Sequence, residues 1–266
     1  PQRGDAYGLR QAMDTVGAFA GPLVAMVLMA ATGDDFRLVF WVAVLPAVVC
    51  VLLILFGVEE PDVHRPAATR FPLRREAVAR LPARYWMVVA FAGVLTLARF
   101  SEAFLLLRAE SLGLAATWVP LILIVMNLAY AASAYPFGKL ADAGRPHRLL
   151  AVSLLFLIAA DLVLAAAPNA WLTGLGAVLW GMHMGASQGL LATLVAAHCP
   201  ADLRGTGFGV FHLLNGLALL LASLIAGALW TKLGAAATFL AGALFALLAG
   251  IGLWLDTKKP PRRAAQ

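Results

Sequence analysis

The side chains best placed to do chemistry in this chain are charged residues that stand inside long apolar segments. Arg99 and Glu102 are the sharpest pair, because residues three apart in a helix share a face and can form an ion pair. Pairing would offset much of the cost of burying both charges, so a purely structural salt bridge is one interpretation. In the other, Glu102 exchanges a proton while Arg99 holds an anion or the deprotonated carboxylate.

Two further ionisable residues, Asp14 and His183, also lie within apolar stretches. A carboxylate inside a membrane costs about 2.5–3.5 kcal/mol, so Asp14 needs a partner or a proton, unless it only caps a helix near the membrane surface. A histidine gains and loses a proton near neutral pH, which suits His183 to proton handling, although a hydrogen-bonded packing role is the alternative. Three uncharged residues complete the candidate substrate and proton pathway: Asn127, Gln188 and Asn215.

The composition indicates that membrane-spanning helices carry these residues. The chain is 62% hydrophobic and 13% charged, with a mean hydropathy of +0.86, unlike a water-soluble domain. Eight apolar stretches have about the 20 residues that a helix needs to cross the membrane, and they are too long and uniformly apolar for barrel strands. They lie near residues 12–32, 37–57, 86–107, 116–137, 149–167, 171–197, 208–230 and 235–255. The sequence therefore predicts an all-α, multi-pass membrane protein.

The net charge of +6 is distributed as in a membrane protein rather than as in a nucleic-acid-binding protein. Sixteen of the twenty Lys and Arg residues lie at the two ends or in alternate connections between the predicted spans, and only Arg37, Arg108 and Lys232 lie in the opposite set. Since positive residues accumulate on the cytoplasmic side, both ends of the chain are expected in the cytoplasm. Nucleic-acid binding would need these charges on one folded face, so it is excluded.

An internal repeat indicates how the spans are organised. The residues RGDAYGL at Arg3–Leu9 return 201 positions later as RGTGFGV at Arg204–Val210, and Asp14 aligns with Asn215. Each copy opens a long apolar segment. A membrane protein with two related structural units is most often a transporter whose site lies between the halves.

A polar segment divides the chain into two unequal parts. Residues 59–84 contain four prolines and six arginines and have no hydrophobic run, which is typical of a linker, with a short surface helix expected around residues 73–81. We therefore expect the last two helices of a first bundle in 1–58, a cytoplasmic linker in 59–84, a six-helix second bundle in 85–257 and a basic cytoplasmic tail in 258–266. If the two halves are equal, four further helices are expected before Pro1.

Three features of the sequence resemble those of transporters of the major facilitator superfamily. Residues 17–25, GAFAGPLVA, resemble the family's antiporter motif, and residues 138–145, GKLADAGR, resemble its cytoplasmic loop motif. The third feature is the central basic linker. The resemblance covers the whole chain as helices five to twelve of an inferred twelve, and it implies two bundles that rock around a central site.

The residues of the antiporter-like motif can be interpreted in two ways, as part of a transport mechanism or as simple helix packing. Gly17 and Gly21 lie four apart on one helix face, so another helix can approach the backbone closely. Pro22 removes a backbone hydrogen bond and bends the helix. In the resembling family this bend seals the interface between the halves and is associated with drug/proton antiport, whereas simple helix packing would use the same residue types.

The resemblance also implies roles for residues nearer the cytoplasm and the periphery. The loop motif implies a cytoplasmic gate that holds one conformation until substrate or proton binding shifts the equilibrium, built from Gly138, Asp142, Gly144, Arg145 and Arg148. The helix that carries Asp161 would be peripheral, so Asp161 is expected to be an assembly contact or a structural partner.

The sequence argues against an enzyme and favours transport. It has no phosphate-binding loop, no His-Glu-x-x-His zinc motif and no nucleophile elbow, and Cys50 and Cys199 form neither a disulfide framework nor a metal site. We therefore predict a monomeric, cofactor-free secondary transporter of a small molecule in a bacterial inner membrane, with proton-coupled efflux. The alternatives are a proton-coupled importer, a facilitator, a non-transporting membrane scaffold and an inactive fragment.

Overall fold

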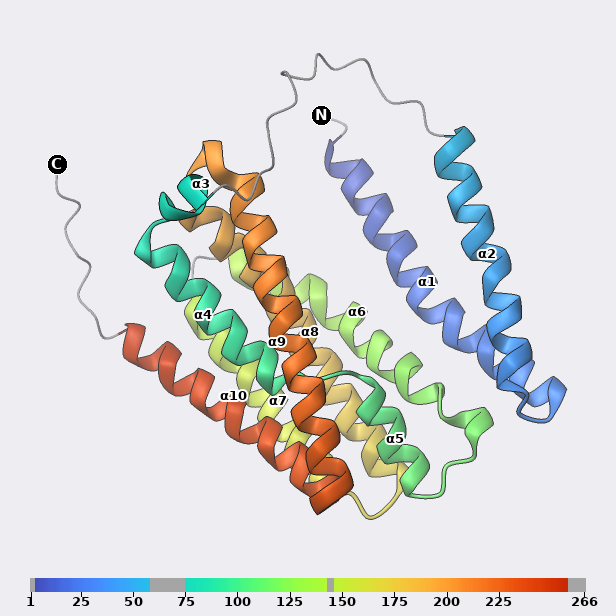
Figure 1. Ribbon diagram of the computed structural model, residues 1–266. Helices are drawn as coiled ribbons and strands as arrows, with labels where there is room; N and C mark the ends of the chain where they lie inside the picture. The colour runs from blue at the N-terminus through green and yellow to red at the C-terminus, as the bar shows by residue number, and fades with distance from the viewer. Residues whose placement is uncertain (1–2, 58–74, 143–145, 258–266) are drawn as a thin grey trace, which may run out of the picture.

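The computed structural model describes residues 3–57, 75–142 and 146–257. The predicted basic tail and residues 58–74 of the predicted linker lie outside this part. Across the described residues the chain is built from helices and contains no strand (Figure 1). The predicted all-α fold is confirmed.

Helices stand at every position where the sequence predicted a span, and one predicted span is divided between two helices. In chain order they are α1 (Arg3–Thr32), α2 (Phe36–Gly57), α4 (Ala83–Ala98), α5 (Ala103–Ser111), α6 (Leu121–Asp142), α7 (Pro146–Ala166), α8 (Ala170–His198), α9 (Arg204–Leu233) and α10 (Ala235–Thr257). Three short helices complete the described chain: α3 (Arg75–Ala79), inside the predicted linker, η1 (Ala116–Trp118) and η2 (Ala201–Leu203).

The outer surface of the helices is apolar, as lipid requires. Within the described residues, six segments are long and apolar enough to cross a membrane: Phe36–Gly57, Ala83–Ser111, Ala116–Leu140, Arg148–Ala166, Ala201–Leu233 and Ala235–Leu255. Large side chains such as Phe56 (84% exposed) and Trp171 (89% exposed) point out from the helices. In water such a surface would aggregate, whereas in a bilayer it contacts acyl chains. The protein is an integral, multi-pass membrane protein.

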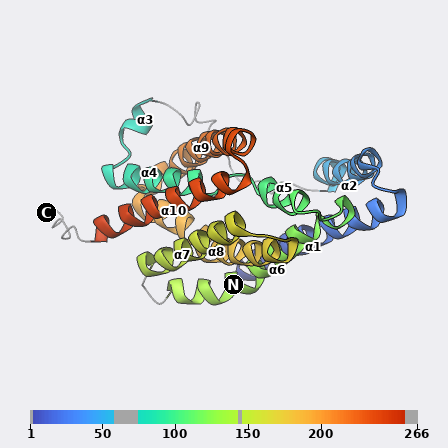
Figure 2. The same cartoon turned by 90° about the horizontal axis from the view of Figure 1, so that it is seen from below.

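The repeat in the sequence corresponds to a repeat in the structure. Helices α1 and α9 each contain 30 residues, and both their first and their last residues are separated by the offset of the two sequence copies. Helix α1 forms a hairpin with α2 that stands beside the other helices and contacts them through α6 and η1 (Figures 1 and 2). At the tip of this hairpin, the hydroxyl of Thr117 in η1 donates a hydrogen bond to the carboxylate of Asp34.

The remaining long helices pack into one bundle in which glycine allows close contact. Helix α8 lies against both α6 and α7, and α10 lies against α4 and α7. A side chain at Gly181 would collide with the carbonyl of Met126, and one at Gly185 would collide with the hydroxyl of Ser133, both on α6. Helices α6 and α8 are therefore closely packed at Gly181 and Gly185, which lie four residues apart on one face of α8.

The prediction of one continuous helix over residues 86–107 is wrong. Helix α4 ends at Ala98, and the Arg99 backbone leaves the helical region with φ −108° and ψ 71°. A new helix, α5, begins at Ala103, whose amide donates to the hydroxyl of Ser101 at 3.3 Å. The break places the ring of Phe100 5.5 Å from Trp180, measured between ring centroids. Tertiary packing therefore overrides the helical periodicity, and the predicted i, i+3 register of Arg99 with Glu102 is lost.

Candidate functional site

Buried polar side chains from three helices gather beside the break between α4 and α5. They are Arg99 at the end of α4, Asp161 on α7, and Trp180 and His183 on α8. Each has at least one buried polar atom with no hydrogen-bond partner among the described residues: Nη1 of Arg99, both carboxyl oxygens of Asp161, Nε1 of Trp180 and Nε2 of His183. We refer to these four residues as the buried polar cluster.

His183 is fully buried, and its hydrogen bonds define its tautomer. Its Nδ1 lies 2.8 Å from the carbonyl oxygen of Ser153 on α7. Since a carbonyl only accepts, Nδ1 carries a proton, and in the neutral ring Nε2 is then a lone-pair acceptor. Arg99 lies close enough to interact electrostatically with His183. An unpaired donor on Arg99 and an unpaired acceptor on His183 thus share one apolar environment.

Asp161 lies inside the bundle rather than at its outer surface. Its side chain is 0% exposed. A Cβ atom added to Gly242 on α10 would lie 2.7 Å from Asp161 Oδ2, 3.0 Å from Phe100 Cε1 and 3.2 Å from the carbonyl oxygen of Ala98. The carboxyl group therefore faces the helix break, with α10 packed over it. The expectation that Asp161 is an assembly contact is wrong.

The geometry of Arg99 and Glu102 differs from that of a simple salt bridge. Among the described residues they are not joined by an ion pair within 4.0 Å; Arg80 and Asp202 form such a pair at 2.7 Å on the surface. Glu102 stands just before α5 and is half-buried, while Arg99 turns its guanidinium into the bundle. The two charges still interact electrostatically, so Glu102 lies at the edge of the buried polar cluster.

The cluster can bind a small polar group or transfer protons. Its unpaired donors, on Arg99 and Trp180, and its unpaired acceptors, on Asp161 and His183, come from elements up to 84 residues apart in the sequence. Leaving a buried polar atom unpaired costs about 1–3 kcal/mol. A ligand, water or proton that pairs these atoms would recover that cost, so the cluster is a candidate binding site.

Two other predicted pathway residues, Asn127 and Asn215, bridge helices. Asn215 Oδ1 on α9 lies 3.2 Å from the hydroxyl of Thr96 on α4. Asn127 on α6 donates from Nδ2 to the carbonyl of Ala18 on α1 at 3.3 Å. Proline at position 22 has no amide hydrogen, so it cannot supply the helical bond that Ala18 would otherwise accept. Asn127 therefore satisfies the carbonyl that Pro22 leaves free, across the contact between α1 and α6.

The two glycines of the antiporter-like motif do not make the close contact that their spacing allows. No described atom lies within 4 Å of a Cβ placed on Gly17 or Gly21. A cavity of about 350 Å³ lies nearby between α1 and α6, with Phe19 and Asn127 in its wall. In the described structure, α1 meets α6 at the hydrogen bond between Ala18 and Asn127.

The remaining candidates lie at the ends of helices or outside the described side chains. Gly138 stands near the end of α6, and Arg148 is exposed near the start of α7. Residues Gly144 and Arg145 are outside the described residues, and so are the side chains of Asp14, Asp142 and Gln188. Their roles as gate and pathway residues remain predictions.

Comparison with known families agrees with this architecture. The model of the Major Facilitator Superfamily matches residues 1–218 and, in a second placement, residues 97–266. The chain belongs to this superfamily. The predicted resemblance is confirmed at the level of the superfamily, and the two overlapping placements agree with a chain built from related halves.

Individual members of the superfamily are similar along most of the chain. An uncharacterized MFS-type transporter, MJ1317, of Methanocaldococcus jannaschii is 26% identical over 254 residues, which are 93% of this chain and 63% of that protein. The uncharacterized proteins Mb2288 of Mycobacterium bovis and Rv2265 of Mycobacterium tuberculosis are each 26% identical over 215 residues, which are 79% of this chain and 52% of each protein. The chain thus spans about half to two thirds of the length of these curated relatives.

The buried polar cluster contains residues that the sequence did not single out as a group. Arg99 and His183 were predicted as pathway residues, whereas Trp180 was not, and Asp161 was assigned to the periphery. Only one sequence signal could have found Asp161: an acidic residue in the middle of an apolar stretch, which in a membrane protein is a functional-site hypothesis in itself. Nothing in the sequence showed that Asp161 faces the α4–α5 break.

Proposed function

We propose that this chain forms most of a secondary transporter that moves a small molecule out of the cytoplasm in exchange for protons. The observation that carries the proposal is the buried polar cluster, in which Arg99, Asp161 and His183 hold unpaired polar atoms inside a membrane-embedded bundle. A scaffold gains nothing from this cost, because apolar residues of the same size would pack the bundle better. A transporter gains a site that substrate or protons can fill.

Proton coupling is supported by the two acidic side chains at this site. A carboxylate buried in a membrane without a cationic partner is costly, so it is retained where it can hold and release a proton. Asp161 is fully buried, and Glu102 is half-buried beside the interior guanidinium of Arg99. A proton arriving on Glu102 can therefore change the local charge that Arg99 experiences.

Export is supported by the resemblance of residues 17–25 to the antiporter motif of the family, which lies in the contact between α1 and α6. The antiporter-like motif holds Pro22, and the free carbonyl that this proline creates is bound by Asn127. This bond joins the two parts of the chain that alternating access would move relative to each other. The opposite direction, import, and uncoupled diffusion are outcomes that the experiment below distinguishes.

The orientation follows from the charge distribution along the sequence. We propose that both ends of the chain and the basic linker lie in the cytoplasm, in the inner membrane of a bacterium. The hairpin tip with Asp34 and Thr117 then faces outward. The functional unit is proposed to be a monomer, since the buried polar cluster is enclosed by helices of one chain.

Everted vesicles that contain the full-length protein, with a pH-sensitive dye to report an imposed proton gradient, test the proposal. Amphiphilic cations, sugars and organic acids are added one at a time. The variants are Glu102→Gln and Asp161→Asn, and the matched control is Glu110→Gln, which removes a carboxylate from the exposed face of α5. We expect one class of compound to dissipate the gradient, and the two site variants, but not the control, to abolish this response.

Two results would overturn the proposal. If the folded, inserted protein leaves the gradient unchanged with every compound, proton antiport fails, and radiolabelled uptake then separates a facilitator from a scaffold. If Glu102→Gln, Asp161→Asn and Glu110→Gln all respond like the wild type, the protein moves protons by a route that does not use the buried polar cluster.

A further inference from the structure

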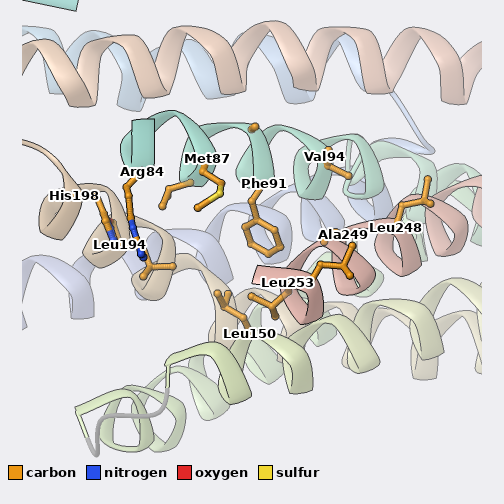
Figure 3. Close-up of a pocket in the computed structure, with 14 residues that line it drawn as sticks. Arg84, Met87, Phe91, Val94, Leu150, Leu194, His198, Leu248, Ala249 and Leu253 are labelled. Atoms are coloured by element: carbon orange, nitrogen blue, oxygen red, sulfur yellow. The ribbon is translucent and has the colours of Figure 1, made fainter. Parts of the chain in front are cut away.

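A second cavity, of about 420 Å³, lies among the helices of the larger bundle (Figure 3). Its wall consists of residues from α4, α7, α8 and α10, and it includes none of the buried polar cluster or the predicted pathway. Most of the lining is aliphatic or aromatic, and two basic residues, Arg84 and His198, are the exception. We refer to this cavity as the Arg84 pocket.

The charge in the Arg84 pocket is confined to one end. Figure 3 shows Arg84 and His198 at the same end, whereas Phe91, Val94 and Leu248 follow along the pocket away from them. Arg84 and Val94 are ten residues apart on α4, which corresponds to about 15 Å along a helix. This is about half of the ~30 Å hydrocarbon thickness of a bilayer, so the pocket is as deep as one leaflet.

The pocket is open to the surroundings of the bundle. Leu248 and Leu255 on α10 line it and are 49% and 51% exposed, and Met87 on α4 is 37% exposed. A water-soluble substrate would gain nothing from such a wall. An acyl chain that enters sideways from the membrane would contact it along its whole length.

Both basic side chains of the pocket have nitrogen atoms that can bind a ligand. Arg80, one turn before Arg84, is neutralised by Asp202 at 2.7 Å, but among the described residues no carboxylate lies within 4.0 Å of Arg84. His198 uses Nδ1 for the carbonyl of Leu194 at 2.9 Å, which leaves Nε2 for a ligand. Basic pockets between membrane helices on the cytoplasmic side are suited to the phosphate groups of anionic lipids.

We propose that the Arg84 pocket binds one anionic phospholipid, with its phosphate against Arg84 and His198 and an acyl chain along Phe91 and Leu253. This site goes beyond the proposed transport function, because its lining is separate from the buried polar cluster. Arg84 lies at the end of the basic linker, where headgroups of the adjacent leaflet are found. The bound lipid fills the space between α4 and α10 and stabilises their contact.

Native mass spectrometry of the full-length protein in detergent, titrated with phosphatidylglycerol or with phosphatidylcholine of the same acyl chains, tests this site. We expect the wild type to bind phosphatidylglycerol more tightly. Arg84→Ala lowers that affinity about fivefold, as expected for one basic residue near a lipid headgroup. Arg84→Lys keeps the charge and most of the affinity. Arg80→Ala is the matched control, since it removes a neighbouring charge that already has a carboxylate partner.

A second variant tests the apolar part of the pocket independently of charge. Gly252 lines the pocket, and a Cβ placed on it has open space around it, so the side chain of Gly252→Leu would start in open space and occupy part of the pocket. We expect this variant to keep its fold, measured by its elution volume and melting temperature, and to lose the lipid adduct. Equal binding of the two lipids, or an undiminished adduct in both Arg84→Ala and Gly252→Leu, would overturn the proposal. Neither result depends on whether the protein transports protons.

Discussion

The hydrogen bond from Asn127 to the carbonyl of Ala18 should stabilise the contact between α1 and α6 because Pro22 leaves that carbonyl without its helical partner. Replacing Asn127 by alanine removes the donor. The contact then weakens, and conformations in which the two parts separate at this position become more populated. Replacing Pro22 by alanine restores a helical partner for the Ala18 carbonyl, since the new amide can donate to it within α1.

The size of the effect follows from the environment of this bond. Hydrogen bonds between membrane helices contribute about 0.6 kcal/mol on average, and hydrogen bonds in proteins generally contribute about 1 kcal/mol. The 3.3 Å distance is long for an N–H···O bond, so we expect this bond to contribute no more than these two values. An energy of about 0.6–1 kcal/mol changes the ratio of closed to open molecules by about three- to fivefold.

The measurement is the distance distribution between spin labels on the two parts of the chain. Arg37 at the start of α2 and Ser111 at the end of α5 are both exposed, so cysteines there can carry labels after Cys50 and Cys199 are replaced by serine. The distribution is recorded for four proteins: the parent, Asn127→Ala, Pro22→Ala and the double variant. We expect Asn127→Ala to reduce the ratio of short to long distances about three- to fivefold in the parent.

The double variant decides whether the reasoning is correct. With alanine at position 22, the Ala18 carbonyl is already bonded, so Asn127→Ala should change the ratio much less than it does in the parent. If Asn127→Ala has the same effect in both backgrounds, Asn127 acts by another contact, such as its position in the wall of the neighbouring cavity. If it has no effect in either, the bond does not contribute to the contact between α1 and α6.

Three further outcomes follow from packing, hydrogen bonding and burial. Gly181→Val should lower the melting temperature by an amount that corresponds to about 1–3 kcal/mol, because the side chain collides with α6, whereas Gly174→Val, with no described atom within 4 Å, should not. Tyr85→Phe should cost about 0.5–1.5 kcal/mol in thermal unfolding, since the hydroxyl donates to the carbonyl of Gly207 at 2.7 Å. Burial raises the pKa of the Cys199 thiol, so with Cys50 replaced by serine, maleimide at neutral pH should label the folded protein more slowly than the unfolded one; equal rates would contradict this.

The sequence was sufficient for the parts of the fold that depend on hydropathy and repetition. Eight apolar stretches predicted the positions of the long helices because a helix must be apolar over its whole length to stand in lipid. The repeat at Arg3 and Arg204 predicted two equivalent helices, and α1 and α9 have the same length at the same offset. The spacing of Gly181 and Gly185, four residues apart in an apolar segment, is typical of a close helix contact, and the structure shows one at these two residues.

The sequence was not sufficient for the break between α4 and α5. The residues from Leu97 to Ala103 contain neither proline nor glycine, so local preferences give no reason to end the helix. Ser101 is the only local signal, since its hydroxyl accepts the amide of Ala103 at the start of α5. The aromatic contacts of Phe100 with Trp180 and Phe239 supply the remaining stabilisation, and they join residues too far apart for any local pattern to show.

The break also changes which residues should be tested first for proton transfer. In an unbroken helix, Arg99 and Glu102 would neutralise each other and could be a structural pair alone. With the helix ended at Ala98, the Arg99 guanidinium enters the bundle, where it approaches His183 and keeps an unpaired Nη1, while Asp161 faces the same break from α7. Arg99, which stays charged, interacts with His183 and with Glu102, so a proton gained by either of these changes the cost of burying the guanidinium, and Asp161 faces the same break as a further buried carboxyl group. Asp161→Asn keeps the size of the side chain and removes its ability to ionise, and because Asp161 is fully buried, this variant tests whether a carboxyl group inside the bundle takes part in proton transfer.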